Sequence, residues 1–152
     1  MIGDWIDKVT YPQLPALNDE ELSSFLNQVQ FARLATHNQD GSIHIAPIFF
    51  KYQDGQIFMA TQCPSRKVRN IENNPNVSVL IDRTELPFKG ALVYGTAELD
   101  YEDVVKKRIE IFERRLSNEE ATTYANRLAA RWPCVIIRIT PTHIVSFDYA
   151  KG

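Results

Sequence analysis

Short apolar runs separated by turn residues dominate the pattern of hydrophobic and polar positions from residue 31 onward. Asp54-Gly55, between two such runs, is typical of a hairpin, because glycine accepts a positive φ and aspartate tolerates it. We expect the first three runs to form an antiparallel meander, and the last two to be one strand pair bent or broken at Pro141. The predicted strands cover residues 31–36, 42–52, 56–61, 77–82, 91–99, 134–140 and 143–147.

Helical spacing of apolar residues marks four other segments, which begin at Asn18, Ser65, Asp100 and Ser117. Asn18 and Ser117 are each followed three residues later by glutamate, which is the signature of a capping box. The second helix is short and should end before Asn74-Pro75, and we expect Asp100 to cap the third. Residues 1–17 are expected to form an extended arm. The predicted apolar stripes are Leu22, Phe25, Leu26 and Val29; Val105, Ile109, Phe112 and Leu116; and Ala121, Ala125, Leu128 and Trp132.

The run from Ser42 to Phe50 is apolar on both of its alternating faces. A half-exposed sheet would show one polar face, so one apolar face should line a core and the other should meet a helix or another subunit. The strand-rich order excludes a doubly wound parallel sheet, in which strands and helices alternate. An antiparallel barrel with an oligomer interface satisfies both observations.

Composition narrows the class of protein. The chain has 152 residues, which is typical of one domain, here taken as residues 1–152. Its net charge of -2 disfavours a nucleic-acid surface, an OB-like barrel included. We expect no membrane helix and no secretory signal, because no run of 18 apolar residues occurs. Cys63 and Cys134 form no C-x-x-C motif, which favours a reducing cytoplasm, and the scattered histidines predict no metal site.

Candidate chemistry concentrates where the third strand gives way to the second helix. Arg66, Lys67 and Arg69 crowd into the first turn of that helix. The positive end of the helix dipole disfavours bases there, so a bound anion is one explanation. Helix amides, these cations and the hydroxyls of Thr61 and Ser65 would converge on a phosphate. The alternative is a solvated basic turn that pairs with Glu72 or other acids. No Walker or dinucleotide fingerprint occurs.

An ordered series of motifs extends across residues 31–100. The series consists of Pro47-Ile-Phe-Phe-Lys51, Asp54-Gly55, Ile57-Phe-Met-Ala-Thr61, Ser65-Arg-Lys67, Asn73-x-Pro75 and Gly95-Thr-Ala-Glu98. In this order and spacing it resembles the pyridoxamine 5′-phosphate oxidase-like family of FMN-binding split β-barrels. The resemblance implies a mainly β fold with flanking helices, containing about six to seven strands and four helices.

The resemblance also implies a homodimer with FMN at the subunit interface. By position, Arg66 and Lys67 would hold the FMN phosphate, with hydroxyl contacts from Thr61 and Ser65. Pro47, Ile48 and Phe49 would lie along the isoalloxazine ring through backbone atoms. Lys51 matches a family lysine near the flavin, and Ala60 stands where the pyridoxamine oxidases carry tyrosine. The Arg-x-His pair of those oxidases is absent, because Arg138 is followed by Ile-Thr-Pro141 and His143 lies beyond.

The leading hypothesis is therefore a cytoplasmic flavoprotein that oxidises or reduces an unidentified small molecule, with no nucleic acid or membrane partner. One alternative keeps the fold but uses deazaflavin or haem. Another is a flavin-binding stress or sensor protein that is not catalytic. Three features are given a purely structural interpretation. Trp132 is expected in the core, and 106–108 and 114–115 are expected on a solvated helix face of mixed charge.

Overall fold

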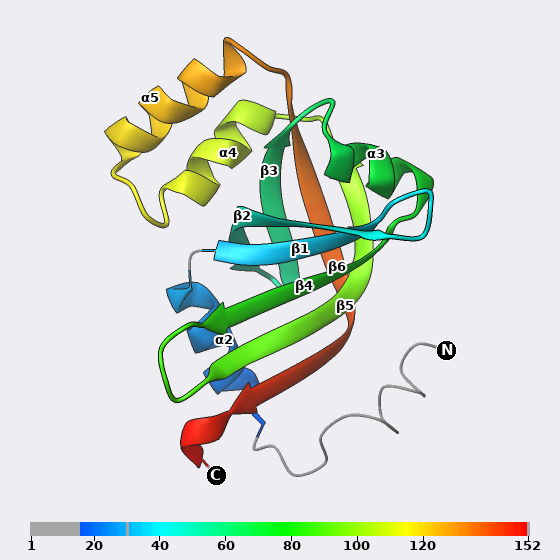
Figure 1. Cartoon of the computed structure of the whole chain (residues 1–152). Helices are drawn as coiled ribbons and strands as arrows, with labels where there is room; N and C mark the ends of the chain where they lie inside the picture. Colours follow the sequence, from blue (N-terminus) through cyan, green and yellow to red (C-terminus); the bar gives the residue numbers. More distant parts are fainter. Residues whose placement is uncertain (1–15, 30, 152) are drawn as a thin grey trace.

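Six antiparallel strands form a closed barrel in the order β1-β2-β3-β6-β5-β4 (Figure 1). The computed structural model describes residues 16–29 and 31–151. β1, β2 and β3 are consecutive neighbours, which confirms the predicted meander, and Asp54 and Gly55 adopt φ values of 52° and 75° at its second turn. The strands are β1 (Phe31–His37), β2 (Ile43–Gln53), β3 (Gln56–Gln62), β4 (Asn76–Arg83), β5 (Lys89–Asp100) and β6 (Cys134–Asp148).

Four α-helices flank the barrel within the described residues: α2 (Asp19–Gln28), α3 (Arg66–Asn73), α4 (Val104–Phe112) and α5 (Asn118–Ala129). A short 3-10 turn, η1 (Tyr149–Lys151), follows β6. Both predicted capping boxes are present, at Asn18 and at Ser117. Figure 1 shows α3 beside the β1–β2 turn and α2 at the other end of the barrel, while α4 and α5 form a separate pair.

The main core fills the barrel, and α2 contributes Phe25 and Leu26 to it. The largest fully buried side chains include Phe50, Leu34, Met59 and Ile137. A second, smaller cluster lies between α4 and α5, where Phe112 packs with Ala121 and Ala125. The predicted stripe of α4 is confirmed, because Val105, Ile109 and Leu116 pack against this cluster.

β6 is one continuous strand across Pro141, so of the two outcomes expected there, a bend or a break, the break does not occur. The chain instead accommodates the proline with a bulge: Tyr94 pairs with His143 and Gly95 pairs with Pro141, which leaves Thr142 as the extra residue. The Thr142 hydroxyl donates to the Tyr94 carbonyl oxygen at 3.1 Å. A strand can continue through a proline at a bulge, because the ladder of hydrogen bonds is already interrupted there and the N–H that proline lacks is not required.

Asp100 does not cap α4, which corrects a second prediction. It is the last residue of β5 and pairs with Ile136, and α4 begins only after Asp103, whose φ is 48°. The Asp100 carboxylate accepts from the Glu102 amide at 3.0 Å and from Lys107 Nζ at 2.7 Å. The Lys107 hydrogen bond holds the pKa of Asp100 below its usual value. Strand pairing extended β5 through the position at which the sequence pattern indicated a helix cap.

Two arginines contradict the solvated face of mixed charge that was expected for the third predicted helix, which corresponds to α4. Arg114 donates to the carbonyl oxygens of Phe50, of Leu26 at 3.0 Å and of Val29 at 2.8 Å. Arg108 is only 7% exposed, and its guanidinium lies 5.7 Å from the Phe112 ring centroid. These arginines pack α4 and the turn after it against the rest of the chain.

Trp132 also departs from prediction, because 40% of its surface is exposed. α5 ends at Ala129, so the helical stripe that would have turned Trp132 inward does not continue. The guanidinium of Arg131 lies 4.9 Å from the centroid of the indole ring instead.

The predicted N-terminal arm lies outside the described residues apart from Ala16 and Leu17. Cys63 and Cys134 are free thiols. In the described ranges, every helix is too short or too polar to cross a membrane. The same ranges contain no group of three or more His, Cys, Asp or Glu placed to hold a metal ion.

Candidate functional site

The start of α3 is built by a short loop that leaves β3 at Gln62 and contains a cis peptide bond between Cys63 and Pro64. Ser65 is the N-cap, and its hydroxyl accepts from the Val68 amide at 3.4 Å. The first amides of a helix have no acceptor within the helix. The amides of Arg66 and Lys67 are therefore available to a ligand at this end of α3.

The basic side chains of Arg66 and Lys67 form no ion pair with an acid in the described residues. No acid lies in the first turn of α3, and within residues 31–151 no carboxylate forms an ion pair with Arg66 or Lys67. Lys67 is half-buried, and burial lowers its pKa because the charged form loses solvation. The pairing with Glu72 that the sequence left open does not occur, so the cationic turn is available to an external anion.

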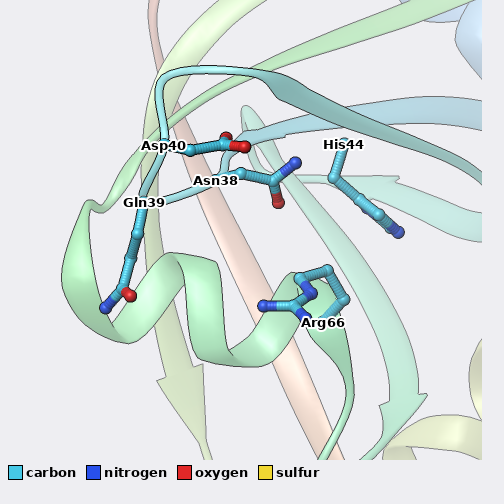
Figure 2. A pocket seen from close by; sticks show the side chains of 5 residues that line it. All are labelled: Asn38, Gln39, Asp40, His44 and Arg66. Carbon is cyan, nitrogen blue, oxygen red and sulfur yellow. The ribbon is translucent and has the colours of Figure 1, made fainter.

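A pocket of about 320 Å³ lies between α3 and the β1–β2 turn. Its lining residues are Asn38, Gln39, Asp40, His44 and Arg66. In Figure 2 the Asp40 carboxylate and the Arg66 guanidinium come from opposite sides of this pocket, and His44 lies farther along β2. Hydrogen bonds from Ser42, and more weakly the charge of Arg66, lower the pKa of Asp40.

One buried amide holds the two walls of the pocket together. Asn70 on α3 is 2% exposed, and its Nδ2 donates to Thr36 Oγ1 at 3.1 Å and to Asn38 Oδ1 at 2.8 Å. Thr36 is itself 1% exposed at the end of β1. The β1–β2 turn is thus fixed relative to α3, and the pocket is part of the folded framework.

Sequence reasoning missed the wall of this pocket formed by the β1–β2 turn. In the sequence Asn38, Gln39 and Asp40 form an ordinary polar turn, and His44 is one of the scattered histidines that predict no metal site. Their approach to Arg66 depends on closure of the barrel, which brings β1 next to β4 and places α3 across the barrel end. No local signal in the sequence encodes that approach.

β2 and β3 pair over only part of their length, and they separate close to the proposed ring-binding segment. β2 pairs with β3 only from Phe50 to Gln53, whereas it pairs with β1 from Ile43 to Phe49. Figure 1 shows that β2 starts at the turn beside α3 and that β3 diverges from this part of β2. Along residues 47–49 one edge of β2 therefore has no strand partner among the described residues, and a flat ligand could use its backbone groups.

The three residues predicted to contact the ring differ in their burial and packing. Pro47 is exposed, while Ile48 points into the barrel core and is 8% exposed. Phe49 stacks on Phe31 with a centroid distance of 4.4 Å and meets the edge of Phe112 at 5.7 Å. The side chains of Ile48 and Phe49 are thus engaged in packing, so any contact of these two residues with a ring would involve their backbone.

The remaining predicted residues lie on β2 and β3, and they are not all close to the pocket. Lys51 lies seven residues from His44, or about 24 Å along an extended strand, and its ammonium is 4.0 Å from Glu110. The structure therefore does not bring Lys51 to the pocket that contains Arg66. On β3, Ala60 is half-buried and Thr61 is 6% exposed at the last inward position, close to Ser65 in the chain.

These residues suit a cofactor with a phosphate at one end and a flat ring at the other. The start of α3 supplies two cations without acidic partners and free amides, which are the groups that bind phosphate. The edge of β2 at residues 47–49 supplies backbone donors and acceptors next to the place where β2 and β3 separate. The donor set fits a flavin mononucleotide.

Several solved structures resemble this fold. The conserved hypothetical protein Rv2991 of Mycobacterium tuberculosis aligns with a TM-score of 0.79 and 23% identity, covering 93% of this chain and 90% of that chain. The haem storage protein HutZ of Vibrio cholerae aligns with a TM-score of 0.68 and 18% identity, covering 85% and 94%. An F420 reductase aligns with a TM-score of 0.67 and 20% identity, covering 84% and 98%.

No curated protein sequence matches the chain. A family model described as pyridoxamine 5′-phosphate oxidase matches residues 18–146, which include all six strands apart from the end of β6. The match also covers the motifs from Pro47 to Glu98 and the site at α3. The chain therefore belongs to the pyridoxamine 5′-phosphate oxidase family.

Proposed function

We propose that this protein binds FMN and acts as an oxidoreductase on a small molecule. The observation that carries the proposal is the cationic start of α3, where Arg66 and half-buried Lys67 have no carboxylate partner in the described chain beside a pocket of about 320 Å³. A phosphate dianion there would offset the solvation that Lys67 loses on burial.

The protein's contribution would be to bind and orient the cofactor. FMN, when bound, would supply the redox chemistry. Arg66 is suited to grip two phosphate oxygens at once, while Lys67 would act as a point charge. The unpaired edge of β2 at residues 47–49 would hold the ring, and the packing of Phe49 against Phe31 and Phe112 would keep that edge rigid.

The test is to purify the protein with added FMN and to record its visible spectrum. We expect a flavin spectrum and tight, saturable binding, followed by bleaching when a nicotinamide donor is added without oxygen. A colourless protein that ignores FMN would overturn the proposal. Bound flavin that NADH and NADPH fail to reduce, and that reoxidises too slowly to be useful, would favour a flavin-binding stress or sensor role.

We also propose that two copies associate through the outer face of β2. Ile43 and Ile45 lie on this face and are 50% and 64% exposed, and exposed Pro47 follows them on the same face. Large aliphatic side chains in a row on an open strand face are typical of an interaction surface. The face leads directly to the proposed ring-binding edge, so a dimer would complete the flavin pocket.

Replacing Ile45 with aspartate tests the dimer. Because Ile45 is largely exposed in the single chain, the fold should tolerate the change within about 0.5 kcal/mol. We expect sedimentation to show a dimer for the wild type and a monomer for Ile45→Asp, with weaker FMN binding. A wild type that is monomeric at all concentrations would refute this interface.

Two related cofactors remain candidates because relatives of the same fold are named for them. The F420 reductase points to a deazaflavin, and HutZ points to haem. His44 would be a candidate haem ligand, since it lines the pocket and its buried Nδ1 has no hydrogen-bond partner among the described residues. Parallel titrations with FMN, F420 and haemin decide between them, and a haem spectrum that is lost in His44→Ala would replace the FMN proposal.

A further inference from the structure

The pocket at α3 is lined by an acidic side chain in addition to Arg66. Asp40 lines the pocket on the β1–β2 turn, opposite Arg66 (Figure 2). An acid in an anion-binding pocket opposes binding of negative charge, so the position of Asp40 needs a reason beyond phosphate recognition.

The position of the Asp40 carboxylate is set by the turn. Its Oδ1 accepts from the Ser42 amide at 3.0 Å and from the Ser42 hydroxyl. A hydrogen bond also connects this turn to α3, because Asn70 Nδ2 donates to Asn38 Oδ1 at 2.8 Å. The carboxylate therefore stays ionised and in place at neutral pH, and it does not form an ion pair with Arg66 within 4 Å in the described structure.

The pocket therefore has a positively charged wall at Arg66 on α3 and a negatively charged wall at Asp40 on the β1–β2 turn. A phosphate seated against Arg66 and the first amides of α3, with Lys67 as the next residue of the helix, would lie on the cationic side. A cofactor that continues beyond this first phosphate would extend toward the β1–β2 turn, because the turn forms the remaining wall of the pocket. Any additional anionic group would then approach the Asp40 carboxylate and be repelled by it.

We propose that Asp40 restricts this site to cofactors that end at a single phosphate, by repelling the further anionic groups of a cofactor such as FAD. The inference rests on the proposed flavin site, which it deepens by assigning its specificity. Asp40 makes no contact with the reacting atoms in this arrangement. It is a specificity-determining residue, and its effect is measured as a ratio of two affinities.

The experiment compares FMN, FAD and riboflavin binding to the full-length wild type and to Asp40→Asn by fluorescence titration. Asparagine retains an oxygen that can accept from Ser42, so the turn is preserved. We expect the ratio of the FAD to the FMN dissociation constant to fall about three- to fivefold in Asp40→Asn. Riboflavin affinity should not change, and added salt should shrink the difference between the proteins.

Asp54→Asn is the matched control. It removes the same charge from the other turn of β2, about 30 Å away and several Debye lengths at about 0.1 M salt, and should leave the ratio unchanged. An unchanged ratio in Asp40→Asn, or weaker FAD binding as expected if the carboxylate holds the second nucleotide, overturns the inference alone. A wild type that binds no flavin overturns the proposed function, and the assignment of Asp40 with it.

Discussion

α3 and α4 both carry basic clusters, but the surrounding structure treats them differently. On α4 and the turn after it, Lys107 pairs with Asp100 at 2.7 Å and Arg114 donates to three carbonyl oxygens. On α3, Arg66 and Lys67 have no carboxylate partner in the described residues. The comparison teaches that a cationic cluster indicates a ligand only where the fold leaves its charges without acceptors.

The largest expected effect follows from removing the free cations. Arg66→Ala combined with Lys67→Ala should weaken FMN binding by about 3–6 kcal/mol, because each charge-assisted contact is worth about 1.5–3 kcal/mol. Riboflavin, which lacks the phosphate, should bind both proteins equally. Lys106→Ala, an exposed site on α4, is the control for loss of charge. Unchanged FMN affinity in the double variant would refute the site assignment.

The next largest effect concerns the other basic cluster, on α4 and the turn after it, whose charges have partners. Arg114→Ala should lower the free energy of unfolding by about 3 kcal/mol, because it leaves carbonyl groups of β2 and the end of α2 without their donor. Urea denaturation followed by circular dichroism measures this change. Arg114→Lys should recover only part of it, since an ammonium lacks the planar fork. A loss below about 1 kcal/mol would show that these hydrogen bonds are replaceable.

A smaller effect should appear in the pH dependence of FMN binding. Burial lowers the pKa of Lys67 in the free protein, and a bound phosphate dianion would raise it again. Binding therefore takes up a proton once the free lysine is neutral, so affinity should fall as pH rises, beginning below 10.5. We expect a loss of up to about tenfold. Lys67→Arg should flatten the profile, because guanidinium stays charged. Identical profiles would exclude Lys67 as the titrating group.

The smallest effect concerns the Asp100–Lys107 pair. Lys107→Ala should cost less than about 1 kcal/mol of stability at neutral pH, because both side chains are partly exposed. The pair lowers the pKa of Asp100 in the folded state, so its contribution is present above the ordinary value of 3.8 and is lost as pH falls through the folded pKa. Unfolding curves of the two proteins should converge in acid, and a difference that persists there would assign the effect to packing.

Local signals in the sequence predicted most of the elements. The capping boxes at Asn18 and Ser117, the Asp54-Gly55 turn and the helix start at Ser65 all depend on residues within a few positions of one another. Prediction failed where distant segments compete for the same residue. Asp100 pairs with Ile136 on β6 instead of capping a helix. β6 continues past Pro141 through a bulge opposite Gly95 instead of breaking there.

For the candidate site, the sequence alone determined the part that we propose binds phosphate. Ser65, Arg66 and Lys67 are adjacent, so the helix that they start brings their groups together whatever the rest of the chain does. Only the tertiary structure decided that these cations stay unpaired, that β2 and β3 separate beside residues 47–49, and that Asp40 faces Arg66. The physical reason is that these features depend on closure of the barrel, which brings together segments whose approach no local pattern encodes.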